Sequence, residues 1–181
     1  MYNFSKICCI VASVAIIFSA CHSTKKITST EKKNTAYEKN TRKKINAKYA
    51  ELLGVDEKEI KNQQLYAFID EWYGVPYKYD GNTKKGIDCS GLAELIYATV
   101  YNKTIKGSAA AIFNQCKEVK QKNVQEGDLL FFKIESKNIS HIGVYLQNNK
   151  FVHASTKKGV RIDNLNDAYF LKTFYKIGRL P

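Results

Sequence analysis

Cysteine is scarce in the part of this 181-residue chain that can fold. The chain has five cysteines, and Cys8 and Cys9 lie within an apolar N-terminal run. Only Cys21, Cys89 and Cys116 follow that run. An odd set of this kind does not make a disulfide framework, so the fold must draw its stability from a hydrophobic core. Cys116 follows Ile112 and Phe113 on one face of a predicted helix and is expected to be a packed core thiol.

The chain also lacks an apolar N-terminal segment long enough to cross a bilayer comfortably. Residues 7–20 are nearly all apolar, but a spanning helix needs roughly 20 such residues. Lys6 precedes the run and small residues end it, which predicts a signal peptide over residues 1–20. Phe18-Ser19-Ala20-Cys21 resembles a bacterial lipobox, and this resemblance implies cleavage before Cys21 and lipidation of its thiol. The alternative is an ordinary signal peptide followed by an incidental cysteine.

Acidic residues are few, 17 against 29 basic ones, so the formal net charge is +12. Much of the excess lies in residues 21–48, whose Lys, Ser, Thr and Asn content predicts a disordered tether behind the lipidated cysteine. Basic chains often bind nucleic acid. Here export and the lack of an aromatic-basic RNA signature exclude nucleic acid as a partner. Anionic lipid or cell-wall polymer is the expected partner, unless the charges are only solvated.

No internal repeat divides residues 49–181, which are long enough for one domain with a sizeable core. Apolar spacing predicts helices over residues 56–73, from Cys89, and over 109–119. Strands are predicted over 129–133, 141–146, 150–154, 160–162 and 173–180. Helices followed by strands predict an α+β fold with N-terminal helices packed on a central antiparallel β-sheet. We expect a monomer.

Cys89 stands where a loop turns into a helix. The apolar residues after it, Leu92, Leu95, Ile96 and Val100, are spaced as the buried stripe of an amphipathic helix. The N-terminus of such a helix carries unpaired N–H groups and about half a positive charge. Both favour a thiolate, so we expect the pKa of Cys89 to be lowered. A small buried cysteine is the alternative interpretation of the local sequence.

Only three histidines are present, and two of them follow Cys89 in predicted strands. A lone cysteine that meets His141 and His153 only through folding is the layout of a cysteine nucleophile and its base. A tight turn at Asn148-Asn149 would pair Val144 with His153 and leave His141 roughly 10 Å further along. The register must therefore differ, or a bulge must intervene, if the two histidines touch. A metal site made of the same three residues is an alternative, but no close ligand pair has metal-site spacing.

Five segments together resemble the NlpC family of papain-like bacterial cell-wall peptidases. They are Gly74-Val75-Pro76-Tyr77, Asp88-Cys89-Ser90-Gly91-Leu92, Gly127-Asp128-Leu129, Ser140-His141-Ile142-Gly143-Val144-Tyr145 and His153-Ala154-Ser155. They occur in the family's order and cover most of the predicted domain. The resemblance implies a papain-like fold, with Cys89 as nucleophile, His141 as general base and His153 orienting it. It also implies that Tyr77 helps to stabilise the oxyanion, together with the Cys89 N–H.

The same resemblance implies supporting or substrate-binding roles for Asp88 and Ser90. Asp80 stands where many relatives carry a glycine, and we expect it to line the cleft. The implied function is a lipid-anchored cysteine endopeptidase of peptidoglycan stem peptides that needs no cofactor. It would be held through Cys21 on a membrane facing the cell wall, and the lack of an aspartate after Cys21 favours the periplasmic face of an outer membrane. The alternative is a non-catalytic, lipid-anchored peptidoglycan-binding protein.

Overall fold

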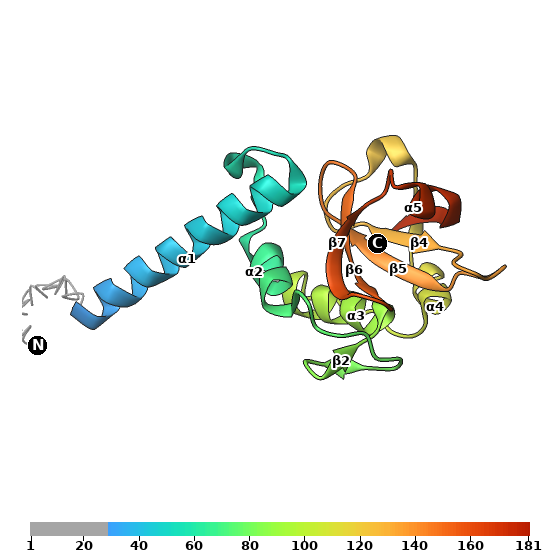
Figure 1. The fold of residues 1–181 in the computed structure, drawn as a ribbon, viewed down its shortest axis with the longest axis horizontal. Helices are drawn as coiled ribbons and strands as arrows, with labels where there is room; N and C mark the ends of the chain where they lie inside the picture. Colours follow the sequence, from blue (N-terminus) through green and yellow to red (C-terminus); the bar gives the residue numbers. More distant parts are fainter. Residues whose placement is uncertain (1–28) are drawn as a thin grey trace, which may run out of the picture.

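A long helix, α1 (Ser29–Leu53), leads into the folded domain and extends well away from the sheet (Figure 1). The computed structural model describes residues 29–181, with side chains from residue 38 onward. The predicted signal peptide over residues 1–20 and Cys21 lie outside the described residues. The disordered tether predicted for residues 21–48 is wrong over residues 29–48, because they are helical. The segment contains neither proline nor glycine, so no residue in it breaks a helix.

The C-terminal end of α1 belongs to the domain core. Tyr49 and Leu53 are fully buried, and Ile45 packs against the same cluster. The helix stops at Gly54, whose φ of 67° suits a residue without Cβ. Gly54 N–H donates to Glu51 C=O and Val55 N–H donates to Ala50 C=O, which is the Schellman pattern. The helix therefore crosses the predicted domain boundary at residue 49 and ends inside the fold.

The single helix predicted over residues 56–73 is two elements. A short 3₁₀ turn, η1 (Glu57–Glu59), precedes α2 (Gln63–Trp72). Between them, the Asn62 side chain accepts a hydrogen bond from Leu65 N–H and caps α2. The helix α2 packs against α1 and α3 through an apolar face made of Leu65, Tyr66, Phe68 and Ile69.

The next segment forms a small hairpin and two helices. Strands β1 (Asn82–Thr83) and β2 (Gly86–Ile87) pair just before α3 (Cys89–Val100), and α4 (Ala109–Phe113) follows. The helix predicted over residues 109–119 is therefore too long. Residues 117–119 instead form β3 (Lys117–Val119), because they pair with the last strand of the sheet. Tertiary pairing outweighs local helix preference there.

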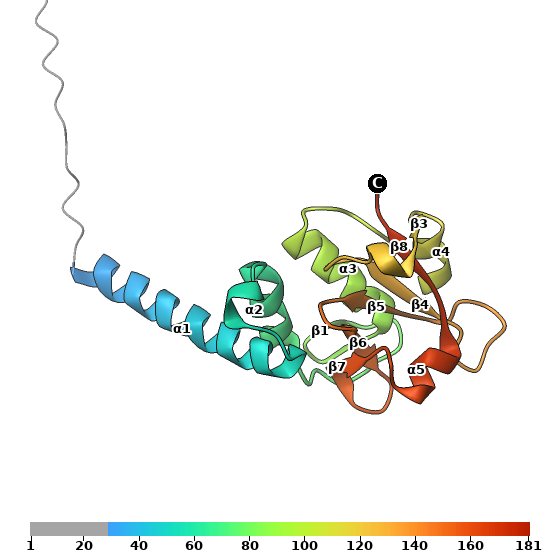
Figure 2. The same ribbon diagram turned by 90° about the horizontal axis from the view of Figure 1, so that it is seen from above.

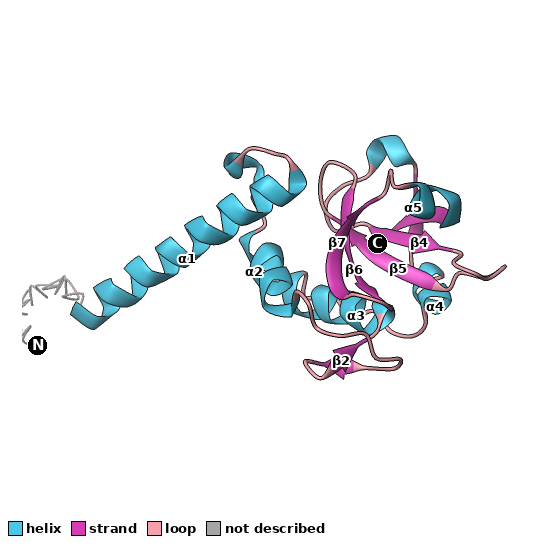
Figure 3. Cartoon of the chain, viewed as in Figure 1, coloured by secondary structure: helices cyan, strands magenta, loops and turns pink. Residues whose placement is uncertain are grey.

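Six antiparallel strands form the central sheet in the order β3-β8-β4-β5-β6-β7. They are β3, β4 (Leu129–Phe132), β5 (His141–Tyr145), β6 (Lys150–Ser155), β7 (Gly159–Asn164) and β8 (Phe174–Arg179). A 3₁₀ turn, η2 (Gln121–Asn123), lies between β3 and β4, and α5 (Ala168–Thr173), which the sequence did not predict, lies between β7 and β8. Figure 3 shows α1 and α2 to one side of the strands of the sheet.

Two apolar layers bury the two faces of this sheet. Alternate residues of β4 point to opposite sides, so Leu129 and Phe131 join the large cluster with α1, α2 and α3, whereas Leu130 and Phe132 join a smaller one. Phe170 of α5 covers the smaller cluster, and Figure 2 shows the placement of α3 and α5 around the strands. The α+β, papain-like prediction of helices packed on an antiparallel sheet is confirmed.

The outer edge of β7 is occupied by the chain segment after α2. Gly74 N–H donates to Val160 C=O and Val160 N–H donates to Val75 C=O, both at 2.8 Å. A Cβ on Gly159 would lie 2.3 Å from the Val75 carbonyl oxygen, so this close approach requires glycine there. Tyr77 follows this segment and bridges to Ile87. The edge contact thus helps to place Tyr77 beside the start of α3.

Candidate active site

Cys89 is the first residue of α3, and Asp88 fixes that helix start. One carboxylate oxygen of Asp88 accepts hydrogen bonds from Gly91 N–H at 2.6 Å and from the Ser90 hydroxyl at 3.0 Å. Its other oxygen accepts from Asp80 N–H at 3.0 Å. Asp88 is therefore an N-cap that also ties the preceding loop to the helix. Roles of Asp88 and Ser90 in substrate binding remain predictions.

The environment of Cys89 favours a neutral thiol. Burial raises the pKa of Cys89 to about 11, and the nearby charge of Asp88 acts in the same direction. Backbone hydrogen-bonding groups of Ile142, Ser90 and Cys89 itself lower it, but by less. The predicted lowering of this pKa is thus wrong, because desolvation outweighs the helix start.

An open cleft of about 440 Å³ runs past Cys89. Tyr77, Asp80 and Ser90 line it, as was predicted for Asp80. Burial, and then the proximity of Cys89, raise the pKa of Tyr77, so its hydroxyl keeps its proton and can donate a hydrogen bond. Further lining residues come from the α3 helix, the loop before α4 and the loop before β5: Glu94, Gly107, Ser108, Ile139 and Ser140.

His141 and His153 do touch, because a bulge changes the hairpin register. Gln147 C=O accepts from Lys150 N–H, while Leu146 N–H donates to Lys150 C=O, so two residues oppose one. Asn148 and Asn149 form the turn with φ of 49° and 59°. Val144 consequently pairs with Val152 rather than with His153.

This one-residue shift decides which face His153 occupies. In the observed register His141 and His153 share a face of the sheet, whereas the tight-turn register would place them on opposite faces. His141 Nε2 lies 2.8 Å from His153 Nδ1, and both side chains are buried. The different register or bulge that a contact between the two histidines was expected to need is therefore present.

His141 is a neutral imidazole. Burial lowers its pKa to about 3, and the adjacent His153 contributes in the same direction. Helix α3 packs on β5 and β6, and the Cys89 sulfur faces the backbone of Ile142, the residue after His141. Among the described residues no hydrogen bond joins the sulfur to the imidazole of His141. The structure therefore places both groups in one region and leaves both uncharged.

His153 also contacts a carboxylate, that of Asp163, which was not predicted from the sequence. Asp163 Oδ2 lies 2.9 Å from His153 Nε2, and Asp163 Oδ1 lies 2.6 Å from Arg161 Nη2. Both new residues come from β7. Alternation of Val160 and Ile162 with Arg161 and Asp163 was the available signal, since it places the two charged side chains on one face.

The second cysteine is set apart from this region. Cys116 Sγ lies 3.3 Å from Ile112 C=O, and burial raises its pKa to about 11. It packs against the main core cluster, as predicted. Within residues 38–181 no group of three metal-ligating side chains could hold an ion. No helix of the described chain is both long enough and apolar enough to cross a membrane.

A cysteine at the start of a helix, packed on an antiparallel sheet that carries a buried histidine pair, defines a papain-like domain. Residues 74–179 match the model of the NlpC/P60 family. The chain belongs to this family, as the resemblance implied.

Named relatives and solved structures are similar to much of the chain. A "Probable endopeptidase" of Haemophilus influenzae is 36% identical over 61% of this chain and 69% of its own length. The "Murein DD-endopeptidase MepS/Murein LD-carboxypeptidase" of Escherichia coli is 32% identical over 93% of this chain and 88% of its own. A crystal structure of an NlpC/P60 family protein from Bacillus cereus superposes with a TM-score of 0.60 and 25% identity. That match covers 66% of this chain but 40% of the Bacillus chain.

Proposed function

We propose that this protein is a cysteine endopeptidase that cuts the peptides of peptidoglycan. The observation that carries the proposal is Cys89 at the start of α3, lining an open cleft with Tyr77 and lying beside the strand that presents His141. Relatives named as an endopeptidase and as a murein DD-endopeptidase support the substrate class.

The reaction begins from the neutral pair. His141 Nδ1 accepts the thiol proton as the Cys89 sulfur bonds to the carbonyl carbon of the substrate amide. The Cys89 N–H and the Tyr77 hydroxyl donate hydrogen bonds to the oxyanion. Imidazolium His141 then gives its proton to the leaving amine as the C–N bond breaks. Water, deprotonated by His141, hydrolyses the thioester and restores the thiol.

The test is cleavage of purified sacculi, measured as newly formed free amines and by mass spectrometry of the soluble fragments. Cys89→Ala should abolish release, because no other group supplies the nucleophile. Cys116→Ala is the matched control and should keep activity, since Cys116 packs in the core away from the cleft. Undiminished release by Cys89→Ala would contradict the proposal.

The rival function is peptidoglycan binding without catalysis. The described basic side chains of α1, namely Lys39, Arg42, Lys43, Lys44 and Lys48, support it because they would attract an anionic wall polymer. It predicts that wild-type protein sediments with sacculi, releases no amines, and dissociates as salt rises. Cleavage by the wild type decides against it.

We further propose that Cys21 is lipidated and holds the protein on a membrane facing the wall, on the periplasmic side of an outer membrane. The apolar run that ends in small residues before Cys21 supports this location. The helix α1 would then separate the membrane from the domain. At about 1.5 Å per residue, a helix of 25 residues spans roughly 38 Å.

A further inference from the structure

Four side chains from three neighbouring strands form one continuous hydrogen-bonded chain. His141 on β5 contacts His153 on β6, His153 contacts Asp163 on β7, and Asp163 contacts Arg161. His153 pairs directly with Arg161 across the β6–β7 ladder, and Asp163 lies two residues along on the same face. The polar chain is therefore a product of strand register.

Apolar rings enclose the middle of this chain. The rings of Phe151 and Phe170 lie 5.0 and 5.4 Å from the ring of His153, centroid to centroid. The His153 side chain is 4% exposed and that of Asp163 is 15% exposed. Hydrogen bonds shielded from water in this way hold their partners strongly in one geometry.

Asp163 is ionised. Burial alone would raise the pKa of its carboxyl group, but the hydrogen bond from His153 and the guanidinium of Arg161 together lower it below its ordinary value. An ionised carboxylate only accepts hydrogen bonds. The proton in the His153–Asp163 contact therefore sits on His153 Nε2.

That assignment bears on where the protons of both imidazole rings lie. When His153 is neutral, its one ring proton on Nε2 leaves Nδ1 unprotonated, so Nδ1 accepts a hydrogen bond from His141. His141 Nε2 then carries the proton of that ring, so His141 Nδ1 holds a free lone pair. That nitrogen is the base which the reaction needs.

We infer that Asp163, held by Arg161, is a positioning residue that fixes the tautomers of His153 and His141 and so keeps His141 Nδ1 available as the base. This role of Asp163 in catalysis rests on the proposed endopeptidase function. Asp163 touches neither the cleft nor Cys89, and it acts only through the two imidazoles.

The decisive substitution is Asp163→Asn, made in the full chain. The neutral amide lacks the charge, and its NH₂ group can donate to His153 Nε2, which reverses the whole chain of donors and places a proton on His141 Nδ1. We expect kcat on sacculus fragments to fall about tenfold to hundredfold, as for other partners that orient a functional histidine. KM should change little, and Asp163→Glu should recover part of kcat. The matched control is Asp167→Asn, on an exposed residue of the next loop, and it should leave kcat and KM unchanged.

Nitrogen-15 NMR of histidine side chains reads the tautomers without any assay of activity. Wild type should show protons on Nε2 of both His141 and His153 at neutral pH, and Asp163→Asn should shift both rings toward the Nδ1–H form. Wild-type rings protonated on Nδ1, or an Asp163→Asn variant with unchanged tautomers and unchanged kcat, would overturn the inference. If the tautomers are as inferred but wild type cuts no sacculi, the proposed function fails and the positioning role stands.

Discussion

At the scale of single residues, burial keeps both the proposed nucleophile, Cys89, and the proposed base, His141, neutral. The pKa of Cys89 is raised to about 11 and that of His141 is lowered to about 3. A preformed thiolate–imidazolium pair would need the opposite directions. In the proposed reaction, attack by Cys89 would therefore be coupled to proton transfer, and the oxyanion donors would supply stabilisation as charge develops.

The raised pKa of Cys89 makes a prediction for its alkylation by iodoacetamide. Only the thiolate reacts, and below the pKa its fraction rises about tenfold per pH unit. The rate should therefore climb steadily from pH 7 to pH 10 without levelling. Mass spectrometry in a Cys116→Ala background assigns the label to Cys89. A rate that has already levelled at pH 6 would indicate an ion pair and would contradict the neutral site.

The sequence sufficed for residues whose chemistry is visible locally. Cys89 precedes an amphipathic stripe, and His141 and His153 are the histidines outside the N-terminal region, so all three could be selected from the printed chain. For Asp163 the alternation along residues 160–163 indicates only a shared face with Arg161, because the contact with His153 depends on the pairing of β6 with β7. The pKa of Cys89 also depends on burial by distant segments, which local patterns do not report.

At the scale of elements, α1 is anchored by its last turns. Asn148, in the turn between β5 and β6, donates from its side chain to Leu53 C=O at 2.9 Å. The end of α1 therefore contacts the hairpin whose bulge brings the two histidines together. A polar, lysine-rich sequence gave no sign of this, because the anchoring contacts come from segments far away in the chain.

Two adjacent leucines of α1 test this anchoring. Leu53 is fully buried and Leu52 is 40% exposed, so the same change to alanine removes core packing in one case only. Leu53→Ala should lower the free energy of unfolding by about 2–5 kcal/mol. Leu52→Ala should change it by no more than about 0.5 kcal/mol. Urea denaturation followed by circular dichroism measures both, and equal effects would show that α1 is not packed on the domain.

The bounds of the strands were predicted more accurately than those of the helices. The pattern located β4, β5, β6, β7 and β8 within one or two residues, since alternating or continuous apolar runs reflect burial between two layers. The short strand β3 has two exposed residues and no such pattern. Its existence depends on pairing with β8, which is distant in sequence.

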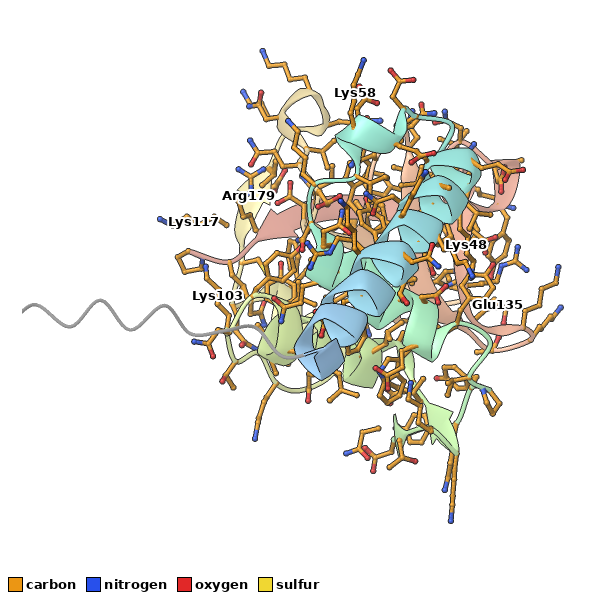
Figure 4. The ribbon with its side chains drawn as sticks, turned by 90° about the vertical axis from the view of Figure 1, so that its left-hand side faces the viewer. Lys48, Lys58, Lys103, Lys117, Glu135 and Arg179 are labelled. Carbon is orange, nitrogen blue, oxygen red and sulfur yellow. The ribbon has the colours of Figure 1, made fainter. Side chains whose placement is uncertain are left out.

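At the scale of the whole molecule, charge is unevenly placed. Cationic side chains project from α1 and from the domain surface, where Lys58, Lys103 and Lys117 point outward (Figure 4). The cleft beside Cys89 instead carries Asp80, Asp88 and Glu94 and no lysine or arginine. The basic side chains that would attract an anionic surface are therefore separate from the candidate active site.

The proposed anchor predicts how the protein leaves a membrane. Lipid chains contribute about 0.8 kcal/mol per buried CH₂ and do not depend on salt. The basic surface attracts only over a Debye length, which falls to about 3 Å at 1 M salt. Wild type should stay in membranes washed with 1 M salt, and exported Cys21→Ser should be released. Cys116→Ser is the control and should stay bound, and a Cys21→Ser protein that also stays bound would contradict lipidation.

The segment that covers β7 has a consequence for self-association. An uncovered strand presents unpaired N–H and C=O groups, on which a strand of another chain can add. On β7 the Val160 groups are already bonded to residues 74 and 75. The opposite edge, β3, spans three residues and exposes Lys117 and Glu118, which disfavours a long ladder. The covered start of β7 and the short, charged strand β3 therefore both disfavour edge-to-edge addition of another chain.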